Sequence, residues 1–227
     1  MTDRTAAGYD AVADEYAAHY ASELDHKPFD RAFLDGFVAR LRPGARVLDL
    51  GCGPGHVGRY VHDRGLLVEG IDVSPRMVAA ARALNPGMTF AVGDMRSLDV
   101  ARSSGSSRAD AADGALAFYS IVHFRPDELA HVFRGINRAL RRDGLLALTF
   151  HLGDEVRHVD ALLGVATDLD FRFFPSDVVV TALVEAGFEI VERLERGPYV
   201  PSVEAQTQRG YVMARRSSSA GEVSPAP

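Results

Sequence analysis

Apolar residues follow two different spacings in alternate segments of this chain, and these spacings predict alternating strands and helices. Short apolar runs suit buried strands, and stretches with apolar residues at every third or fourth position suit helices. The predicted strands cover residues 47–50, 66–72, 88–94, 114–121, 145–150, 188–196 and 209–216. The predicted helices cover residues 9–41, 57–61, 75–84, 126–140 and 176–187. Because strand and helix alternate five times, the pattern predicts an α/β fold whose mostly parallel sheet carries helices on both faces.

Three segments lack this spacing and are expected to be irregular. Residues 101–113 are rich in Ser, Gly and Ala, which is typical of an exposed, mobile loop. Residues 151–174 show a less regular pattern, and residues 217–227 form a polar tail that we expect to be disordered. Residues 1–216 as a whole are expected to fold as a single domain.

The composition narrows the class of protein. The chain has 227 residues, 47% of them hydrophobic, and a net charge of −6, which is typical of one globular α/β domain. No basic stripe is visible, so we expect no nucleic-acid partner. We expect no membrane partner, because no apolar run approaches the ~20 residues that span a bilayer and the N-terminus lacks a signal-peptide core. A single cysteine, Cys52, agrees with a cytoplasmic location, and the oligomeric state is not predicted.

The stretch VLDLGCGPGHVG carries the strongest chemical signal. It predicts a strand, a tight glycine turn and a helix start, where free N–H groups and the positive end of the helix dipole suit an electron-rich ligand. Gly53, Gly55 and Gly58 match the G-x-G-x-x-G pattern of dinucleotide-binding proteins. Asp49 with Gly51, Gly53 and Gly55 forms a second pattern. A carboxylate is unfavourable beside the pyrophosphate of a dinucleotide and favourable beside an ammonium group. Asp49 therefore favours the second pattern, with a ligand that carries an ammonium group.

Acidic residues also end the second and third predicted strands. Asp72 lies nineteen residues beyond Gly53, where a carboxylate can accept hydrogen bonds from both hydroxyls of a ribose. Asp94 can accept from an adenine amino group, while its apolar neighbour Met95 packs against the ring. These residues are expected at one edge of the sheet, because the carboxyl ends of parallel strands meet there.

Together these features resemble the ordered motif set of the class I S-adenosylmethionine-dependent methyltransferases, small-molecule branch. The likeness runs from about Tyr9 to Arg216, and includes YDAVADEY, similar to an N-terminal helix of small-molecule members, and IDVSPRMVAAAR, similar to the second motif. It implies a Rossmann-like, seven-stranded, mostly parallel sheet with helices on both faces and the last strand pair antiparallel. It also implies a helical lid over about residues 1–41 and a cap over residues 151–174.

The resemblance implies S-adenosyl-L-methionine as the cofactor. Asp49 and Gly51 would hold its methionine end, and Tyr16 would lie near the methionine carboxylate. Asp72 would hold the ribose, although an acid at this position is expected for nicotinamide cofactors as well. The full set of implied cofactor-binding residues is Tyr16, Asp49, Gly51, Gly53, Gly55, Asp72, Val73, Met77, Asp94, Met95 and Phe118.

The implied activity is methyl transfer to a small-molecule acceptor, with O- or N-methylation favoured over C-methylation. Guanidinium and aromatic groups in the cap suit a small acceptor that is partly aromatic or anionic. The candidate substrate-binding residues are Tyr20, Lys27, Tyr119, Arg157, Arg172 and Phe173. A composition rich in Ala, Arg and Val is typical of GC-rich bacteria and agrees with a role in bacterial natural-product biosynthesis.

Two histidines at strand ends are candidate general bases. His123 follows the fourth predicted strand and His151 ends the fifth, and an imidazole titrates near neutrality, as a base should. A structural role is the alternative for each, and a carbon or an already ionised nucleophile needs no base. No His, Cys, Asp or Glu spacing matches a metal site, so no metal is expected. An NAD(P)-dependent oxidoreductase and a non-catalytic domain of the same fold are the competing functions.

Overall fold

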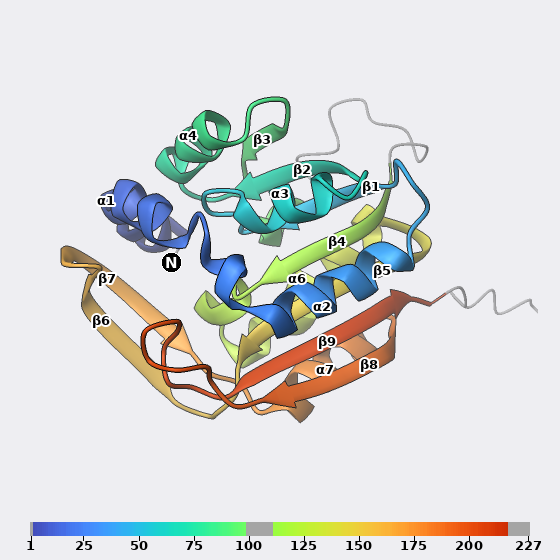
Figure 1. Cartoon of the computed structure of the whole chain (residues 1–227). Coiled ribbons are helices and arrows are strands. Elements are labelled where there is room, and N and C mark those ends of the chain that lie inside the picture. The colour runs from blue at the N-terminus through green and yellow to red at the C-terminus, as the bar shows by residue number, and fades with distance from the viewer. Residues whose placement is uncertain (1, 99–110, 218–227) are drawn as a thin grey trace, which may run out of the picture.

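A computed structural model of the chain describes residues 2–98 and 111–217, and a seven-stranded sheet forms its centre (Figure 1). The strands lie in the order β3-β2-β1-β4-β5-β9-β8. Their bounds are β1 (Arg46–Leu50), β2 (Leu67–Asp72), β3 (Thr89–Val92), β4 (Ala112–Phe118), β5 (Leu140–His151), β8 (Phe188–Arg196) and β9 (Arg209–Arg216). Strands β1 to β5 pair in parallel, whereas β9 pairs antiparallel with β5 and with β8. The predicted fold class is confirmed.

Helices cover both faces of this sheet. They are α2 (Pro28–Ala39), α3 (His56–His62), α4 (Pro75–Leu84), α6 (Pro126–Ala139) and α7 (Ser176–Glu185). Val47 of β1 packs with α2 and α3, whereas the next residue, Leu48, packs with α6 and α7. Successive side chains of a strand point to opposite faces, so one strand supplies two cores. Residues 114–118 of β4 and 144–150 of β5 carry no charged side chain, as this double burial requires.

The segment of residues 151–174 is not irregular, as the sequence predicted, but contains an antiparallel hairpin. Strands β6 (Val156–Leu162) and β7 (Val165–Arg172) form a separate two-stranded sheet. Leu163 and Gly164 both adopt positive φ, as the two-residue turn of a right-twisted hairpin requires. The prediction was wrong because charged residues interrupt the apolar alternation of both strands, and most of β6 is exposed.

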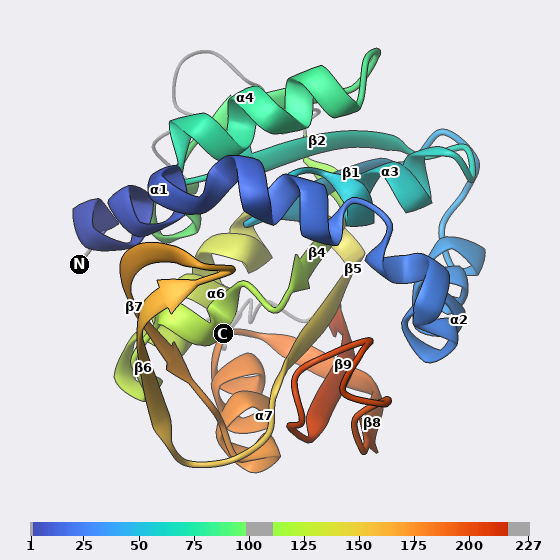
Figure 2. The same ribbon diagram turned by 60° about the vertical axis from the view of Figure 1, so that its left-hand side comes forward.

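The N-terminal segment also differs from the continuous helical stretch predicted over residues 9–41. Helix α1 (Thr2–Tyr20) begins earlier, a 3-10 turn η1 (Glu23–His26) follows it, and α2 begins at Pro28. A proline suits the first turn of a helix but disfavours helix in the residue before it, so the chain bends at Lys27. Helix α1 runs between α4 and the β6–β7 hairpin (Figure 2), and packs on both.

Two segments predicted from composition lie mostly outside the described residues. They are residues 101–110 of the predicted loop and residues 218–227 of the predicted tail. The fourth strand starts at Ala112, two residues earlier than predicted. In residues 2–98 and 111–217, no helix is both long enough and apolar enough to cross a membrane.

Candidate active site

The glycine turn connects β1 to α3 through three left-handed residues. Gly51, Gly53 and Gly55 have φ values of 70°, 51° and 81°, where a side chain would be strained. A Cβ on Gly51 would come within 2.4 Å of the Ser120 side chain. Among the described residues, a Cβ on Gly53 would meet only Tyr16, at 3.7 Å. The main chain at Gly53 is therefore open to a space that Tyr16 borders.

Asp72 ends β2 beside this turn. Its Oδ2 accepts a hydrogen bond from the Gly53 N–H at 2.8 Å, and its Oδ1 accepts one from the Ser74 N–H at 2.9 Å. Burial raises the pKa of Asp72, and these N–H groups act in the opposite direction by favouring the carboxylate. Each oxygen has a second lone pair, so the carboxylate keeps acceptor capacity for a pair of hydroxyls.

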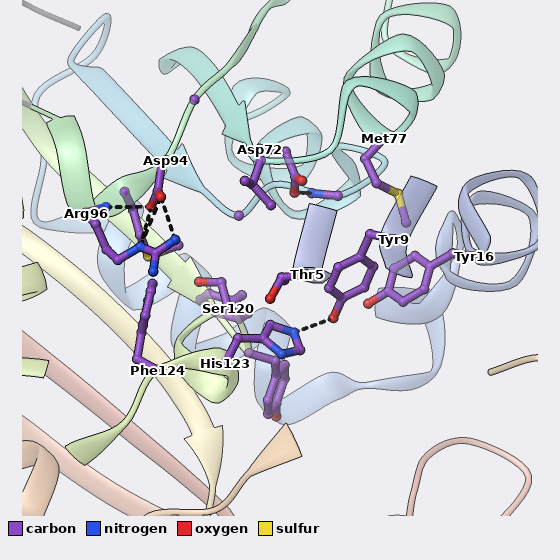
Figure 3. A pocket seen from close by; sticks show the side chains of 17 residues that line it. Thr5, Tyr9, Tyr16, Asp72, Met77, Asp94, Arg96, Ser120, His123 and Phe124 are labelled. Atoms are coloured by element: carbon purple, nitrogen blue, oxygen red, sulfur yellow. Dashed lines mark hydrogen bonds and ion pairs between the residues drawn. The ribbon is translucent and has the colours of Figure 1, made fainter. Parts of the chain in front are cut away.

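A cleft of about 780 Å³ lies between these residues and α1 (Figure 3). Its lining consists of Thr5, Tyr9, Tyr16, Gly51, Gly53, Asp72, Val73, Met77, Gly93, Asp94, Met95, Arg96, Phe118, Tyr119, Ser120, His123 and Phe124. Figure 3 shows these side chains converging from α1, α4 and the strand ends of the sheet. The structure thus brings together every predicted cofactor residue except Asp49 and Gly55.

Asp49, at the end of β1, and Gly55, in the glycine turn, do not line the cleft. Asp49 is buried, its Oδ2 has no hydrogen-bond partner among the described residues, and burial raises its pKa to about 7. A Cβ on Gly58 would lie 2.7 Å from that oxygen, so this glycine makes room for the carboxylate. A Cβ on Gly55 would lie 2.8 Å from the Phe90 ring. Contact of Asp49 or Gly55 with the cofactor remains a prediction.

Asp94 is held by an arginine that sequence reasoning did not single out. The Arg96 Nε and Nη2 donate to Asp94 Oδ2 at 3.0 and 2.7 Å. The Arg96 guanidinium also lies 5.8 Å from the centre of the Phe124 ring. Figure 3 shows the three side chains together at one end of the cleft. A planar cation and an aromatic ring therefore accompany Asp94 at the predicted adenine position. In the sequence, the only local sign of this cation was an Arg directly after the GDM stretch.

His123 faces the cleft with both ring nitrogens engaged. Its Nδ1 lies 2.9 Å from the Asp170 carbonyl oxygen, which can only accept, so Nδ1 carries the proton. Its Nε2 then accepts from the Tyr9 hydroxyl, 2.9 Å away, along the dashed line in Figure 3. Burial lowers the pKa of His123 to about 4. A neutral His123 thus joins Tyr9 of α1 to the backbone of β7.

A second pocket, of about 1400 Å³, adjoins the cleft. Tyr9, Tyr16 and Tyr119 line both spaces. The rest of its lining is His19, Tyr20, Glu23, Lys27, Val122, His151, Arg157, Leu162, Phe171, Phe173, residues 201–207 and Arg209. All the predicted substrate residues except Arg172 therefore border one pocket, next to the predicted cofactor cleft.

His151 stands in the wall of the second pocket. Its Nδ1 lies 2.6 Å from Arg209 Nη1 and 2.7 Å from Thr207 Oγ1. A guanidinium can only donate, so Nδ1 accepts and the neutral ring carries its proton on Nε2. Burial and the positive charge of Arg209 lower the pKa of His151 to about 3. This geometry argues against His151 as a base, because its unprotonated nitrogen is already occupied.

The residues that sequence reasoning missed come mainly from the segment between β8 and β9. Buried Glu204 pairs with Arg196 at 2.5 Å, with Arg209 at 3.3 Å and with Lys27 at 3.7 Å. This network holds residues 201–207 against the second pocket. The segment has no strand or helix pattern, so no local signal marked it. Tyr9, by contrast, was visible within YDAVADEY but was not assigned a role.

The residues present in the first cleft fit S-adenosylmethionine. The open backbone at Gly53 leaves room that a Cβ would take, and Asp72 offers acceptors for ribose hydroxyls. Among the described residues, the buried Oδ2 of Asp49 has no hydrogen-bond partner, but Asp49 does not line the cleft, so its contact with an ammonium group remains a prediction. Met95 and Phe124 supply apolar surface beside Asp94 for a planar base.

Comparison with known sequences points to the same chemistry. A family model described as a methyltransferase domain matches residues 47–144. The malonyl-[acyl-carrier protein] O-methyltransferase of Enterobacter lignolyticus is 33% identical over 142 residues, which are 62% of this chain and 52% of that protein. The trans-aconitate 2-methyltransferase of Mycobacterium tuberculosis is 48% identical over 58 residues, 25% of this chain and 22% of that protein. The chain thus spans about half the length, or less, of these curated relatives.

A solved structure shares the fold over most of the chain. An S-adenosylmethionine-dependent methyltransferase from Methanosarcina mazei matches with a TM-score of 0.66 and 17% identity, covering 80% of this chain and 96% of that one. The matched domain contains the glycine turn, Asp72, Asp94 and His123, so sequence likeness, fold and cleft agree on the same residues. Residues 47–144 thus match a methyltransferase domain, and the chain has the fold of a solved S-adenosylmethionine-dependent methyltransferase.

Proposed function

We propose that this chain transfers a methyl group from S-adenosylmethionine to a small-molecule acceptor, on oxygen or nitrogen. The proposal rests on one observation: the first cleft and the second pocket adjoin, and both are lined by Tyr9, Tyr16 and Tyr119. One space has the residues expected for the cofactor, and the other has the residues expected for an acceptor. The two reactants would therefore face each other across this tyrosine boundary.

S-adenosylmethionine supplies a methyl group already activated as a sulfonium, so the chain's main task is to align the acceptor with it. Holding two reactants in line can contribute roughly 7–11 kcal/mol to lowering the barrier. We assign alignment of the acceptor to the walls of the second pocket, in which Phe173 stacks on His151 with a centroid distance of 5.0 Å. Helix α1, as the predicted lid, and the hairpin, as the predicted cap, would exclude water from the cleft and the second pocket.

An acceptor that must lose a proton has a path through Tyr9. Tyr9 and His123 are hydrogen-bonded to each other, and of the two only Tyr9 lines the second pocket. An acceptor in that pocket would therefore meet the Tyr9 hydroxyl rather than the His123 imidazole. The Tyr9 hydroxyl already donates to His123 Nε2 and could pass a proton to it while accepting one. His123 therefore remains our candidate base, acting through Tyr9.

The acceptor class is supported by the pocket and by the names of the relatives. Those names specify malonyl-[acyl-carrier protein] and trans-aconitate, which are acceptors of those proteins. For this chain we carry over only the class, a small organic group that accepts the methyl. A cytoplasmic location and a role in bacterial natural-product biosynthesis belong to the same proposal.

A ligand comparison tests this function against a nicotinamide-dependent one. The melting temperature is measured with S-adenosylhomocysteine and, separately, with NADH at equal concentrations. A ligand at 100 times its Kd stabilises the folded state by roughly 2.7 kcal/mol. We expect this shift with S-adenosylhomocysteine alone. A shift with NADH alone would favour the oxidoreductase. If S-adenosylhomocysteine binds but acceptor-dependent turnover is never found, the non-catalytic alternative gains support.

A further inference from the structure

We propose that the adenine ring of the cofactor stacks on the guanidinium plane of Arg96, and that Asp94 positions this arginine instead of binding the adenine amino group. The inference rests on the proposed function and assigns Arg96 as a cofactor-binding residue. Three features of the first cleft support it: the place of this pair beside Asp72, the occupied oxygens of Asp94, and the fixed orientation of the guanidinium.

The first feature is the place of the pair beside the predicted ribose position. Strands β2 and β3 are parallel neighbours in which Asp72 lies opposite Val92. The Gly93 N–H donates to the Asp72 carbonyl oxygen at 2.8 Å, and Asp94 follows directly along the chain. Both acids line the same cleft, as does Arg96. A ribose held by Asp72 would therefore place its base within reach of Asp94 and Arg96.

The second feature is the way in which Arg96 occupies the Asp94 carboxylate. Asp94 Oδ1 accepts from the Arg96 backbone N–H at 2.9 Å and from its Nε at 3.1 Å. Oδ2 accepts from the same Nε at 3.0 Å and from Nη2 at 2.7 Å. A carboxylate offers about four acceptor sites, so these contacts leave little capacity for an adenine amino group. The neutral amino group would have to displace a guanidinium, whose charged hydrogen bonds to a carboxylate are stronger.

The third feature is the fixed orientation of the guanidinium plane. Arg96 lies in the 3-10 turn η2 (Met95–Ser97), and the Asp94 side chain caps this turn. The Phe124 ring centre lies 5.8 Å from the guanidinium, and Glu128 Oε1 of α6 lies 3.9 Å from Nη1. Figure 3 shows the guanidinium between the Asp94 carboxylate and the Phe124 ring. A side chain held on several sides presents a preformed flat surface, so little entropy is lost when a ligand binds.

An arginine that is already paired can still bind a base. Stacking uses the face of the guanidinium, whereas the hydrogen bonds to Asp94 use its edge. RNA-binding proteins bind unstacked bases on arginine planes in this way. The Asp94 carboxylate also balances the charge of Arg96, which suits an uncharged base. Arg96 thus supplies the stacking surface, and Asp94 acts through Arg96 as a positioning residue.

Two ligands test the inference in the wild-type protein. Calorimetry first measures the Kd of S-adenosylhomocysteine, and a failure of this ligand to bind would overturn the proposed function itself. The second ligand is its 6-deamino analogue, which has purine in place of adenine and so keeps the flat ring without the amino group. We expect the two Kd values to agree within about threefold. A larger preference for S-adenosylhomocysteine would show that the amino group has a strong acceptor, and would overturn the role assigned to Asp94.

Variants of the pair locate the stacking surface. Arg96→Met keeps a chain of similar width and loses the plane, so we expect both ligands to bind about tenfold more weakly. Arg96→Lys should weaken both ligands as well, because lysine keeps the charge without the plane. Asp94→Asn should weaken both ligands by the same factor, since it acts on the orientation of Arg96. The matched control is Arg125→Met, because Arg125 binds Asp127 at the same spacing of two residues but does not line the cleft.

The outcomes separate the two roles. Unchanged affinity in Arg96→Met and Arg96→Lys would overturn the stacking assignment. An Asp94→Asn variant that weakens S-adenosylhomocysteine and leaves the deamino analogue unchanged would assign the amino group to Asp94 instead. Melting curves without ligand show that each variant is folded, and the comparison of the two ligands in the wild type needs no variant.

Discussion

Asp49 shows at the scale of one residue how function can oppose stability. Its carboxylate lies in the core beneath the glycine turn, one of its oxygens has no partner among the described residues, and its pKa is raised to about 7. The desolvation that raises this pKa also makes the ionised side chain unfavourable in the folded protein. A residue kept in such a place is expected to matter to the ligand above it.

We therefore predict that Asp49→Asn stabilises the free protein at pH 8. A raised carboxyl pKa disfavours folding at pH values above the unfolded value of 3.8, and fully above the folded value of about 7. The gain in unfolding free energy should be on the order of 2–4 kcal/mol at pH 8 and close to zero at pH 4. Urea unfolding at both pH values measures it, and affinity for S-adenosylhomocysteine should fall.

Asp113→Asn provides the matched control. Asp113 is also buried, but its carboxylate binds Arg141 at 2.5 Å and the Arg46 N–H at 2.8 Å. Loss of a satisfied buried acid should lower the unfolding free energy at pH 8. An Asp49→Asn variant that is destabilised like Asp113→Asn would show that Asp49 is a structural residue.

At the scale of elements, α1 is the part that we expect to move when a cofactor enters. Its Val12 and Ala13 are buried against Met77 of α4 and the tip of the β6–β7 hairpin, and Tyr9 and Tyr16 border the cleft. Arg4 binds Asp168 of β7 at 2.7 Å. The helix is thus attached on both sides of the site it covers. Its cover role remains a prediction.

We predict that amides of residues 2–20 exchange faster in the free protein than with S-adenosylhomocysteine. The reason is that the ligand binds only the closed arrangement of an element that opens locally. Asp10 anchors α1, because its Oδ1 accepts from Ser74 Oγ at 2.5 Å and from the Arg76 N–H at 3.0 Å. Asp10→Ala should raise both amide exchange and the ligand dissociation rate about tenfold, measured by hydrogen exchange and stopped flow.

Asp14→Ala is the comparison on the same helix. Asp14 pairs with Arg76 at the surface, where an ion pair contributes little, so its loss should leave both rates nearly unchanged. Exchange over residues 2–20 that is equally slow with and without the ligand would make α1 a fixed part of the core, and entry would then have to pass the hairpin.

At the scale of the whole molecule, the buried titratable groups couple stability to pH in opposite directions. His123 and His151 have pKa values lowered to about 4 and about 3, so the unfolded chain binds their protons first as pH falls. Asp30, Asp49 and Asp72 have raised pKa values, so the folded chain binds theirs first. Falling pH therefore destabilises through the histidines and stabilises through these acids.

A double variant separates the two contributions. We predict that between pH 6.5 and pH 4 the wild type loses more unfolding free energy than His123→Gln with His151→Gln, by on the order of 2–3 kcal/mol for each histidine. The three acids are present in both proteins and cancel in the comparison. Parallel pH profiles from denaturant unfolding would contradict the buried neutral state of both rings. The variant should also melt at a lower temperature at pH 8, because the rings fill space.

The sequence alone was enough to predict the strands of the sheet and the glycine turn. Strands β8 and β9 were predicted with their observed bounds, because a period of two and the flanking breaks are local properties. The glycine turn and Asp72 were predicted for the same reason: they depend on backbone conformations at neighbouring positions. The hairpin in residues 151–174 was missed, since its alternation is weak and its stability comes from packing on α1.

Only the tertiary structure decided the state of the candidate site. The ring nitrogens of His123 and His151 are engaged by Asp170 and Arg209, which lie 47 and 58 positions away along the chain. The second pocket is lined by residues from α1, from the hairpin and from residues 201–207, and no local sequence pattern predicts that these segments lie side by side. Sequence patterns reflect interactions between near neighbours, whereas proton positions and pocket charge depend on groups that only folding brings together.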